Sequence, residues 1–282
     1  NDVDGILPVS IGKKYKEGTS TVIKKSNVLS FDHPVNFGVD MIKLKKIDSL
    51  INDAIQNKMT PGAQLLIAKN SNIIYHKAYG YKTYEKKEKI TNNNIYDLAS
   101  LTKILVSVPL LLNEFMTNDF DLTTKLSDWF PKKELNNKKD LTVKQLFSHY
   151  SGMKSWIPFY KETIDSVTNT RIDKYYSSKK SMKFPFQVSD DLYIRNYNDT
   201  IFNEIINSEL SDSLSYLYSD LPYFLLKFYL EKKYQSSLDT QIKNYLYDKI
   251  GSTSLTYKPT NFLDNKLIVP TAVDDYFRFN IV

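Results

Sequence analysis

The spacing of apolar residues changes once along the chain, and this change restricts the possible folds more than any other feature. Residues 64–79 contain two runs with strand character separated by a polar turn, which predicts a β-hairpin. From Ser100 to Phe115 the apolar residues instead recur every three or four positions, which predicts a helix. Pro109 lies inside this pattern, so we expect it to kink or divide the helix.

The remaining segments also mix helices with extended pieces. The patterns predict further helices at 41–58, 140–147, 223–233 and 238–249, the last ending at Gly251. The tyrosine-rich stretch 154–198 is interpreted as loops with short helices. Residues 1–40 hold short pieces broken by glycine and proline, which is typical of a linker or docking arm.

Composition restricts the classes of protein. With 282 residues, 41% of them hydrophobic, the chain can bury the core of one large domain or two small ones. The net charge of +6 comes from 38 basic and 32 acidic residues in scattered clusters. The chain has no arginine-rich block, which argues against nucleic acid as a partner. No apolar run approaches the roughly 20 residues that span a bilayer, so we predict no transmembrane segment.

Cysteine is absent, which excludes disulfides, thiolate catalysis and cysteine-ligated metals. The three histidines, His33, His76 and His149, have no paired ligand spacing, so we predict neither a metal site nor a cofactor. None of them stands in the context of a Ser-His-Asp nucleophile elbow.

The motif that carries chemistry is Ser-x-x-Lys, formed by Ser100 and Lys103. At a helix start these side chains lie one turn apart on the same face. The helix N-terminus favours an anion that develops on the serine, and a desolvated lysine can accept the proton or direct it to another base. Taken alone, this spacing is equally typical of a capping serine followed by a surface lysine.

The surroundings of the motif are more specific. Three blocks follow one another in order: residues 96–104 (YDLASLTKI), 141–152 (LTVKQLFSHYSG) and 218–220 (YSD). Together they closely resemble the β-lactamase-related family of class C β-lactamases, D-alanyl-D-alanine carboxypeptidases and esterases. The resemblance covers roughly residues 40–282. It implies an α/β (α+β) β-lactamase/transpeptidase-like fold, in which helices flank an antiparallel sheet and a second part is mostly helical.

The resemblance also implies roles for individual residues. Ser100 would attack a carbonyl carbon and form an acyl-enzyme, while Lys103 keeps the serine activated. Tyr218 would shuttle the proton to the leaving group, and a nearby lysine cation would lower the pKa of its phenol. The alternative for Tyr218 is ordinary packing in a chain with 21 tyrosines. His149 is expected to stabilise a turn.

Asp220 departs from the family pattern, where asparagine is common. An ionised aspartate only accepts hydrogen bonds, whereas asparagine also donates them. Asp220 is therefore expected to disfavour β-lactam side chains, and either to bind an ammonium group or to pair with Lys103. Ester or D-amino-acid peptide cleavage stays open.

A second departure concerns the family's third motif, Lys-Thr-Gly or an equivalent, which is absent after Tyr218. We therefore expect 41–282 to be an incomplete domain that lacks the C-terminal strands, with the 64–79 hairpin alone in its sheet. A chain ending at Val282 is expected to be inactive or nearly so. The alternative function is a catalytically impaired module that binds cell-wall peptide, or a structural module.

A narrower resemblance concerns the N-terminus. Residues 5–10 (GILPVS) and 15–18 (YKEG) look like the closing segment of a family 3 glycoside hydrolase, and residues 156–160 and 270–274 look like a subgroup fused to such an enzyme. This implies that 1–40 is a linker or the tail of a preceding glycoside hydrolase domain. It also implies contact with that domain and a periplasmic or extracellular location.

Overall fold

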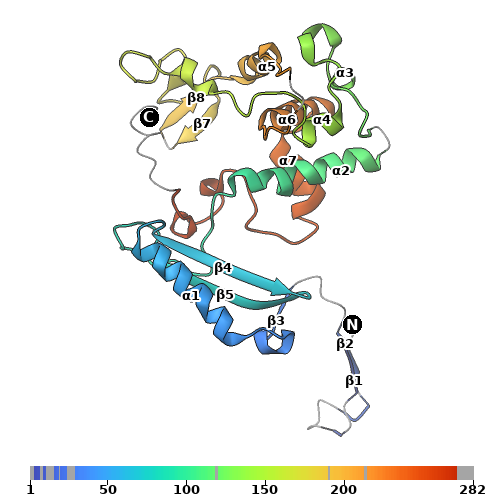
Figure 1. Cartoon of the computed structure of the whole chain (residues 1–282), viewed down its shortest axis with the longest axis vertical. Helices are drawn as coiled ribbons and strands as arrows, with labels where there is room; N and C mark the ends of the chain where they lie inside the picture. Colours follow the sequence, from blue (N-terminus) through green and yellow to red (C-terminus); the bar gives the residue numbers. More distant parts are fainter. Residues whose placement is uncertain are drawn as a thin grey trace. The chain divides into compact units, whose positions relative to one another are not determined.

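The computed structural model describes residues 3–6, 9–10, 16–18, 20–23, 29–117, 120–189, 191–212 and 215–271 (Figure 1). The chain divides into two compact units. The sheet unit contains residues 1–96 and 266–272, and the helical unit contains residues 97–265 and 273–282. Ser100, Lys103, Tyr218 and Asp220 all belong to the helical unit.

The sheet unit is built on the predicted hairpin. Strands β4 (Gly62–Lys69) and β5 (Asn72–Gly80) pair antiparallel, starting from Gly62 opposite Gly80. Both glycines are required there, because a Cβ at Gly62 would lie 2.4 Å from the carbonyl oxygen of Tyr81 and one at Gly80 would lie 2.4 Å from that of Pro61. The chain must therefore come close to itself at the open end of the hairpin.

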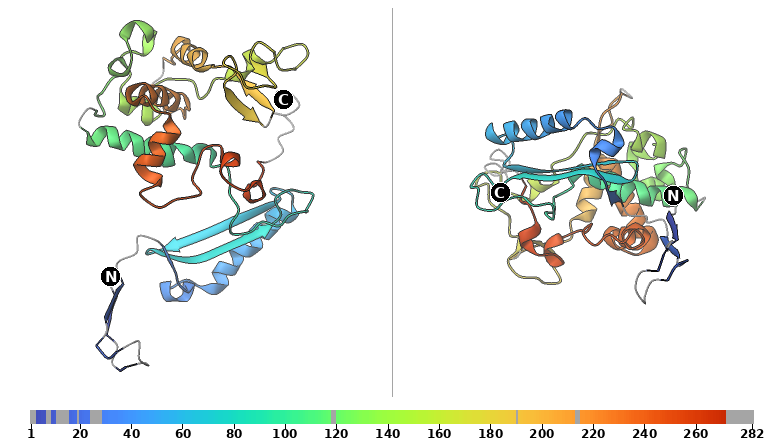
Figure 2. Two further views of the ribbon diagram at one scale, coloured as in Figure 1. Left: turned by 180° about the vertical axis from the view of Figure 1, so that it is seen from behind. Right: turned by 90° about the horizontal axis from the view of Figure 1, so that it is seen from below.

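Helix α1 (Met41–Gln56) covers one face of this hairpin, as Figure 2 shows. Asp40 caps it by accepting hydrogen bonds from the amides of Ile42 and Lys43. One carboxylate oxygen of Asp48 accepts a hydrogen bond from Lys77 Nζ at 2.8 Å. The same oxygen also accepts hydrogen bonds from the hydroxyls of Tyr75 and Tyr79. These hydrogen bonds, the one from Lys77 first, lower the pKa of Asp48 to about 2.

The hairpin is not alone in its sheet, contrary to the prediction. Strand β3 (Ser30–Phe31) pairs parallel with β5, which gives the order β3-β5-β4. A two-residue strand has no alternation to detect, so the sequence could not indicate it. Strands β1 (Val3–Ile6) and β2 (Ser20–Ile23) form a separate antiparallel pair. Of the glycosidase-like segments, residues 7–8, 15 and 272–274 lie outside the described residues.

The helical unit begins with the predicted helix. A 3-10 turn, η2 (Ala99–Leu101), leads into a π segment, η3 (Lys103–Ser107), and then into α2 (Val108–Met116). Pro109 was expected to kink or divide this helix, but the helix is not divided there. Instead the preceding turn widens to π geometry, and the carbonyl of Leu105, to which Pro109 cannot donate, accepts from the Tyr247 hydroxyl at 3.3 Å.

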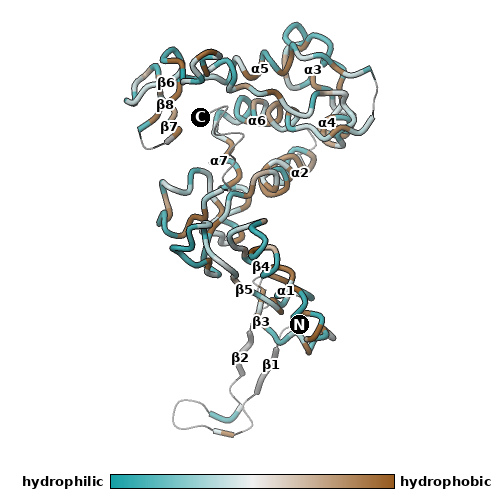
Figure 3. Tube along the Cα trace, turned by 60° about the vertical axis from the view of Figure 1, so that its left-hand side comes forward, coloured by the Kyte–Doolittle hydropathy of each residue, from teal (hydrophilic) through white to brown (hydrophobic). Residues whose placement is uncertain are grey.

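The helix Ala99–Met116 is long and apolar enough, by length and composition alone, to cross a membrane. Figure 3 shows hydrophobic residues concentrated along α2. However, Lys103 and Glu114 on this helix form ion pairs within the helical unit, and charges are costly in a bilayer. Leu110 and Leu111 on this helix belong to the core of the unit.

The other helices of this unit include the predicted ones and some that the sequence patterns did not indicate. They are α3 (Leu126–Trp129), α4 (Val143–Phe147), α5 (Asn198–Asn207), α6 (Leu221–Tyr234), α7 (Leu238–Ile242) and the π segment η7 (Lys243–Tyr247). Thr142 and Gln145 form a capping box at the start of α4. The chain leaves η7 through Gly251, whose φ of +68° favours glycine. Leu146, Ile205 and Leu225 are fully buried in the core they share.

The stretch 154–198 was expected to hold loops with short helices, and this is wrong in part. It contains the 3-10 helix η6 (Phe159–Thr163) but also strands β6 (Tyr176–Ser177), β7 (Phe186–Ser189) and β8 (Leu192–Ile194). They form an antiparallel sheet in the order β6-β8-β7. These strands are too short to give a clear two-residue period. Shorter 3-10 turns complete the list: η1 (Pro34–Phe37), η4 (Lys132–Glu134), η5 (Asn136–Lys138), η8 (Pro259–Asn261) and η9 (Asn265–Leu267).

Candidate active site

Ser100 lies in the first turn of the helix that continues as α2. The residue before it, Ala99, has a φ of +43°, a conformation that costs a non-glycine residue free energy. Asp97 holds this turn, because one of its carboxylate oxygens accepts the amide of Ala99 at 2.8 Å. The hydrogen bond from Asp97 therefore stabilises the backbone conformation immediately before Ser100.

Lys103 lies beside Ser100, as the helical spacing predicts. Its Nζ donates a hydrogen bond to Ser100 Oγ at 3.0 Å. The same ammonium group lies 4.9 Å from the ring centroid of Tyr218 and 5.2 Å from that of Tyr223. The cation is thus held between the serine and two aromatic rings.

Asp220 pairs with Lys103, one of the two alternatives that the sequence left open. The distance between Lys103 Nζ and Asp220 Oδ1 is 2.6 Å, and 15% and 43% of the two side chains are exposed. Burial alone would lower the pKa of Lys103, but its interactions with Asp220 and Tyr218 outweigh burial and raise the pKa above its ordinary value. Lys103 is therefore a cation at neutral pH in this arrangement.

Tyr218 has an acidic phenol for the same reason. Hydrogen bonds from Lys103 and with Ser100 lower its pKa below the ordinary tyrosine value. Tyr218 is 41% exposed. The structure thus brings together all four residues predicted from the sequence, Ser100, Lys103, Tyr218 and Asp220.

The segment that carries Tyr218 and Asp220 is fixed through the residue between them. Ser219 is fully buried, and its hydroxyl donates to the carbonyl of Lys154 at 2.6 Å. The amide of Asp220 donates to the carbonyl of Ser155 at 2.9 Å. These bonds hold the chain in place immediately before α6.

His149 stabilises this segment, in line with the turn-stabilising role expected for it. Its Nδ1 accepts the amide of Ser219 at 3.2 Å, and its carbonyl accepts the amide of Leu217 at 2.9 Å. Its ring centroid lies 4.7 Å from that of Tyr218. Burial, and then the charge of Lys103, lower the pKa of His149, so the ring is neutral at neutral pH and can accept this bond.

Tyr223 belongs to the same cluster and was missed by sequence reasoning. It lies in the first turn of α6, and its ring contacts Lys103, Phe147 and His149. Burial raises its pKa, so it supports the site as an aromatic wall. The available signal was its position three residues after Asp220, where a helix turn returns a side chain to the same face.

No group of three potential metal ligands from histidine and carboxylates occurs among the residues that the structure describes. The chemistry open to the site is that of a serine hydroxyl next to a lysine cation and an acidified phenol. This combination suits covalent acyl transfer.

Comparisons with known proteins concern the family and the fold of the chain. The Beta-lactamase family model matches residues 47–266, and the chain belongs to this family. The β-lactamase/transpeptidase-like fold predicted from the sequence is therefore confirmed.

Individual relatives are more distant. A candidate D-alanyl-D-alanine carboxypeptidase of Escherichia coli O157:H7 is 26% identical over 251 residues, which is 83% of this chain and 52% of that protein. An N-acetylmuramyl-L-alanine amidase of Bacillus subtilis is 26% identical over 77% of this chain and 47% of its own length. The chain thus spans about half the length of these relatives. The octameric penicillin-binding protein homologue from Pyrococcus abyssi has a TM-score of 0.57 at 19% identity, over 80% of this chain and 47% of that one.

Proposed function

We propose that this chain carries the nucleophile of a serine hydrolase that works through an acyl-enzyme. The observation that carries the proposal is the 3.0 Å hydrogen bond between Lys103 Nζ and Ser100 Oγ, with Tyr218 acidified beside the pair. Ser100 is the nucleophile, Lys103 and Tyr218 are catalytic residues, and Asp220 is a substrate-side residue that also holds Lys103.

The proton path follows from the pKa directions. Lys103 is held protonated by Asp220, so it is a poor acceptor for the serine proton. Tyr218 loses its own proton more readily than an ordinary tyrosine, and the neighbouring cation stabilises the phenolate. In the proposed step the phenolate takes the hydroxyl proton of Ser100 while Oγ attacks the carbonyl carbon of the substrate.

The second half of the reaction reverses these roles. Tyr218 returns its proton to the leaving nitrogen or oxygen as the carbonyl carbon loses it, which leaves an ester on Ser100 Oγ. The phenolate formed in this way then accepts a proton from water as the water oxygen attacks the ester carbon. Tyr218 returns this proton to Ser100 Oγ as the C–Oγ bond breaks, which releases the acid and restores the serine. The amide of Ser100, at the start of the helix, is placed to donate to the oxyanion.

The proposed substrates are D-amino-acid peptides, β-lactam-like amides or small esters. The carboxypeptidase and amidase relatives support peptidoglycan-derived substrates, and with them a periplasmic or extracellular location. Asp220 disfavours efficient β-lactam turnover, because its carboxylate only accepts hydrogen bonds and is already paired with Lys103.

The second candidate is a catalytically impaired module that binds cell-wall peptide or plays a structural role, next to a glycoside hydrolase. The Lys103–Asp220 ion pair favours it, since part of the lysine charge is neutralised before any substrate binds.

The test is the intact mass of the chain after incubation with a reactive p-nitrophenyl ester or with a penicillin, in parallel with Ser100→Ala. We expect one adduct on the unmodified chain, and none on the variant. Ser127→Ala, a helix serine outside the cluster, is the matched control and should label normally. Labelling by the ester alone would indicate esterase-like specificity, and labelling by both reagents would indicate penicillin binding.

A folded chain without an adduct from either reagent would favour the impaired module. In that case the same measurement on any longer natural form of the protein decides whether the nucleophile is inactive there too.

A further inference from the structure

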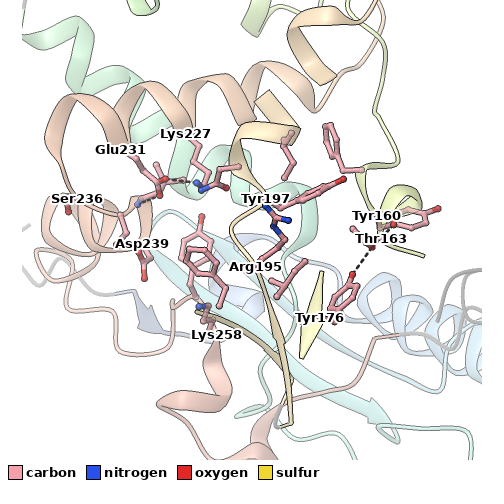
Figure 4. Close-up of a pocket in the computed structure, with 18 of the residues that line it drawn as sticks. Tyr160, Thr163, Tyr176, Arg195, Tyr197, Lys227, Glu231, Ser236, Asp239 and Lys258 are labelled. Carbon is pink, nitrogen blue, oxygen red and sulfur yellow. Dashed lines mark hydrogen bonds and ion pairs between the residues drawn. The ribbon is translucent and has the colours of Figure 1, made fainter. Parts of the chain in front are cut away.

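The helical unit contains a second pocket that the proposed chemistry does not use. It has a volume of about 870 Å³, within the range of small-molecule sites. Its walls come from η6, the β6-β8-β7 sheet, the first turns of α5 and the junction of α6 with α7 (Figure 4). Ser100, Lys103, Tyr218 and Asp220 do not line it.

The walls are mainly apolar and aromatic. The aromatic lining side chains are Phe159, Tyr160, Tyr176, Phe186, Tyr197 and Tyr257. The polar ends of two tyrosines are occupied: Tyr176 shares a hydrogen bond of 2.9 Å with Thr163, and Tyr197 donates to Glu162 at 3.1 Å. Burial raises the pKa of Tyr257 to about 12, as expected where little water reaches the wall.

The acidic and basic residues of the α6 wall are also satisfied. Lys227 pairs with Glu231 at 2.5 Å, and the other oxygen of Glu231 accepts the amide of Leu238 at 2.9 Å. Glu231 thereby caps α7 while it neutralises Lys227. This wall therefore presents no net charge to a ligand.

Arg195 is different. It follows β8 directly, its amide donates to the carbonyl of Tyr175 at 3.0 Å, and the residue is half-buried. Within the described part of the chain, its guanidinium group has neither a hydrogen bond nor an ion pair. Figure 4 shows its side chain between the Lys227–Glu231 pair and the Thr163–Tyr176 pair in this view. Lys258 and Asp239, also on the lining, are exposed and opposite in charge, so Arg195 supplies the net charge of the pocket.

A guanidinium group that is partly removed from water and has no protein partner is an unfavourable arrangement unless something else pairs with it. Its planar set of donors matches a carboxylate in two parallel hydrogen bonds. We propose that this pocket binds a small organic carboxylate with an apolar or aromatic body, whose carboxylate pairs with Arg195 while its body lies against the aromatic walls. This site is separate from the proposed acylation site and does not depend on it.

The test compares three ligands of equal length by calorimetry: 5-phenylpentanoate, 5-phenylpentan-1-ol and 5-phenylpentylamine. We expect the carboxylate to bind at least about tenfold more tightly than the alcohol, because hydrogen bonds to a charged group contribute more than neutral ones. The amine should bind more weakly than the alcohol. Equal affinities, or no saturable binding of the carboxylate, would overturn the proposal.

Variants locate the effect. Arg195→Gln should remove the preference for the carboxylate, and Arg171→Gln, an exposed arginine in the same unit, should retain it. Lys103→Met should also retain it, which distinguishes this pocket from binding at the candidate active site. Arg195→Lys keeps a positive charge and should preserve part of the preference, so the test holds even if the glutamine variant does not fold. A preference unchanged in Arg195→Gln, or lost in Lys103→Met, would contradict the assignment.

Discussion

Two clusters of lysine, carboxylate and tyrosine lie at opposite ends of the helix Ala99–Met116. At its start, Lys103 pairs with Asp220 at 2.6 Å beside Tyr218. Near its end, Glu114 pairs with Lys233 at 2.8 Å and accepts the Tyr229 and Tyr234 hydroxyls at 3.2 and 2.5 Å. The residue types are the same, but the clusters differ in which group faces the tyrosine hydroxyl.

That difference reverses the acidity of the tyrosines. Tyr218 faces the lysine cation, and hydrogen bonding to it lowers the pKa of Tyr218. Tyr229 and Tyr234 donate to the Glu114 carboxylate, and burial followed by this carboxylate raises both pKa values. The first arrangement suits proton transfer, and the second suits stability, because each buried oxygen of Glu114 has a donor.

The largest expected contrast comes from removing one hydroxyl in each cluster. Tyr218→Phe should slow acylation by a p-nitrophenyl ester about 100-fold or more, as expected for loss of a general acid–base, with little change in stability. Tyr234→Phe should leave acylation unchanged and lower the free energy of unfolding by about 1–2 kcal/mol. Burst kinetics and urea unfolding of both variants provide the measurement. If both variants acylate at the same rate, the two clusters do not differ as argued.

The carboxylates should show the same ranking for stability, with the larger loss in the Glu114 cluster. Glu114 is fully buried, so Glu114→Gln removes the buried carboxylate charge that pairs with Lys233 and should reduce the free energy of unfolding by about 3 kcal/mol. Asp220 is 43% exposed, and Asp220→Asn should reduce it by less than about 1 kcal/mol. The measurement is urea unfolding at neutral pH. Comparable losses would mean that Asp220 matters to the fold as much as Glu114 does.

Asp220→Asn should also speed labelling by penicillin, since the amide restores a hydrogen-bond donor and releases Lys103. Intact-mass labelling over time is the measurement. A slower reaction of the variant with penicillin would indicate that Asp220 assists acylation directly.

Lys138 extends the comparison to a lysine whose bonding partners are neutral oxygens. It is fully buried, and its Nζ donates to Asn137 Oδ1 and the carbonyl of Ile206 at 3.0 Å each and to the carbonyl of Ser208. Burial, and then the charge of Lys154, lower its pKa to about 8 from 10.5. Between these values the unfolded chain binds more protons, so the contribution of Lys138 to stability rises as pH rises from about 8 to about 10.5.

This sign can be checked with Lys138→Met. The free energy of unfolding of the unmodified chain minus that of the variant should increase by about 2 kcal/mol from pH 7 to pH 10. Taking the difference removes the titration of the tyrosines, which both proteins share. A flat difference would mean that Lys138 is not desolvated in solution.

The smallest expected effect concerns His149, which acts on Tyr218 through the amide of Ser219. His149→Ala should slow acylation by about tenfold or less, with the effect on kcat rather than KM. His149→Asn should recover part of the rate, because asparagine tolerates the φ of +63° and can accept a hydrogen bond. If alanine and asparagine behave alike, the bond to Ser219 does not position Tyr218.

Local patterns predicted much of the fold. The hairpin β4–β5, helix α1 and helix α4 each depend on residues close in sequence, so the local patterns indicated them. Strand β3 and the β6-β8-β7 sheet were missed, because strands of two to four residues have no clear period. The effect of Pro109 also depended on a distant residue, Tyr247, which supplies a donor to Leu105.

The residues of the candidate site also divide into those that local sequence indicated and those that it did not. Ser100 and Lys103 follow from helix geometry, because positions three apart lie on one face wherever the helix is found. The relevance of Tyr218 and Asp220 came from resemblance, since nothing local links them to Ser100. The protonation of Lys103, the acidity of Tyr218, the support from His149 and the pocket at Arg195 required the tertiary structure.

The sequence by itself thus determined that a serine and a lysine lie one turn apart at the start of an apolar helix, in a chain without thiol chemistry. Only the tertiary structure decided that the lysine is a cation paired with Asp220 and that the tyrosine beside it is acidified. The physical reason is the separation in sequence of the residues involved. Helix geometry follows from neighbouring residues, whereas burial and ion pairs depend on which distant segments pack around a group.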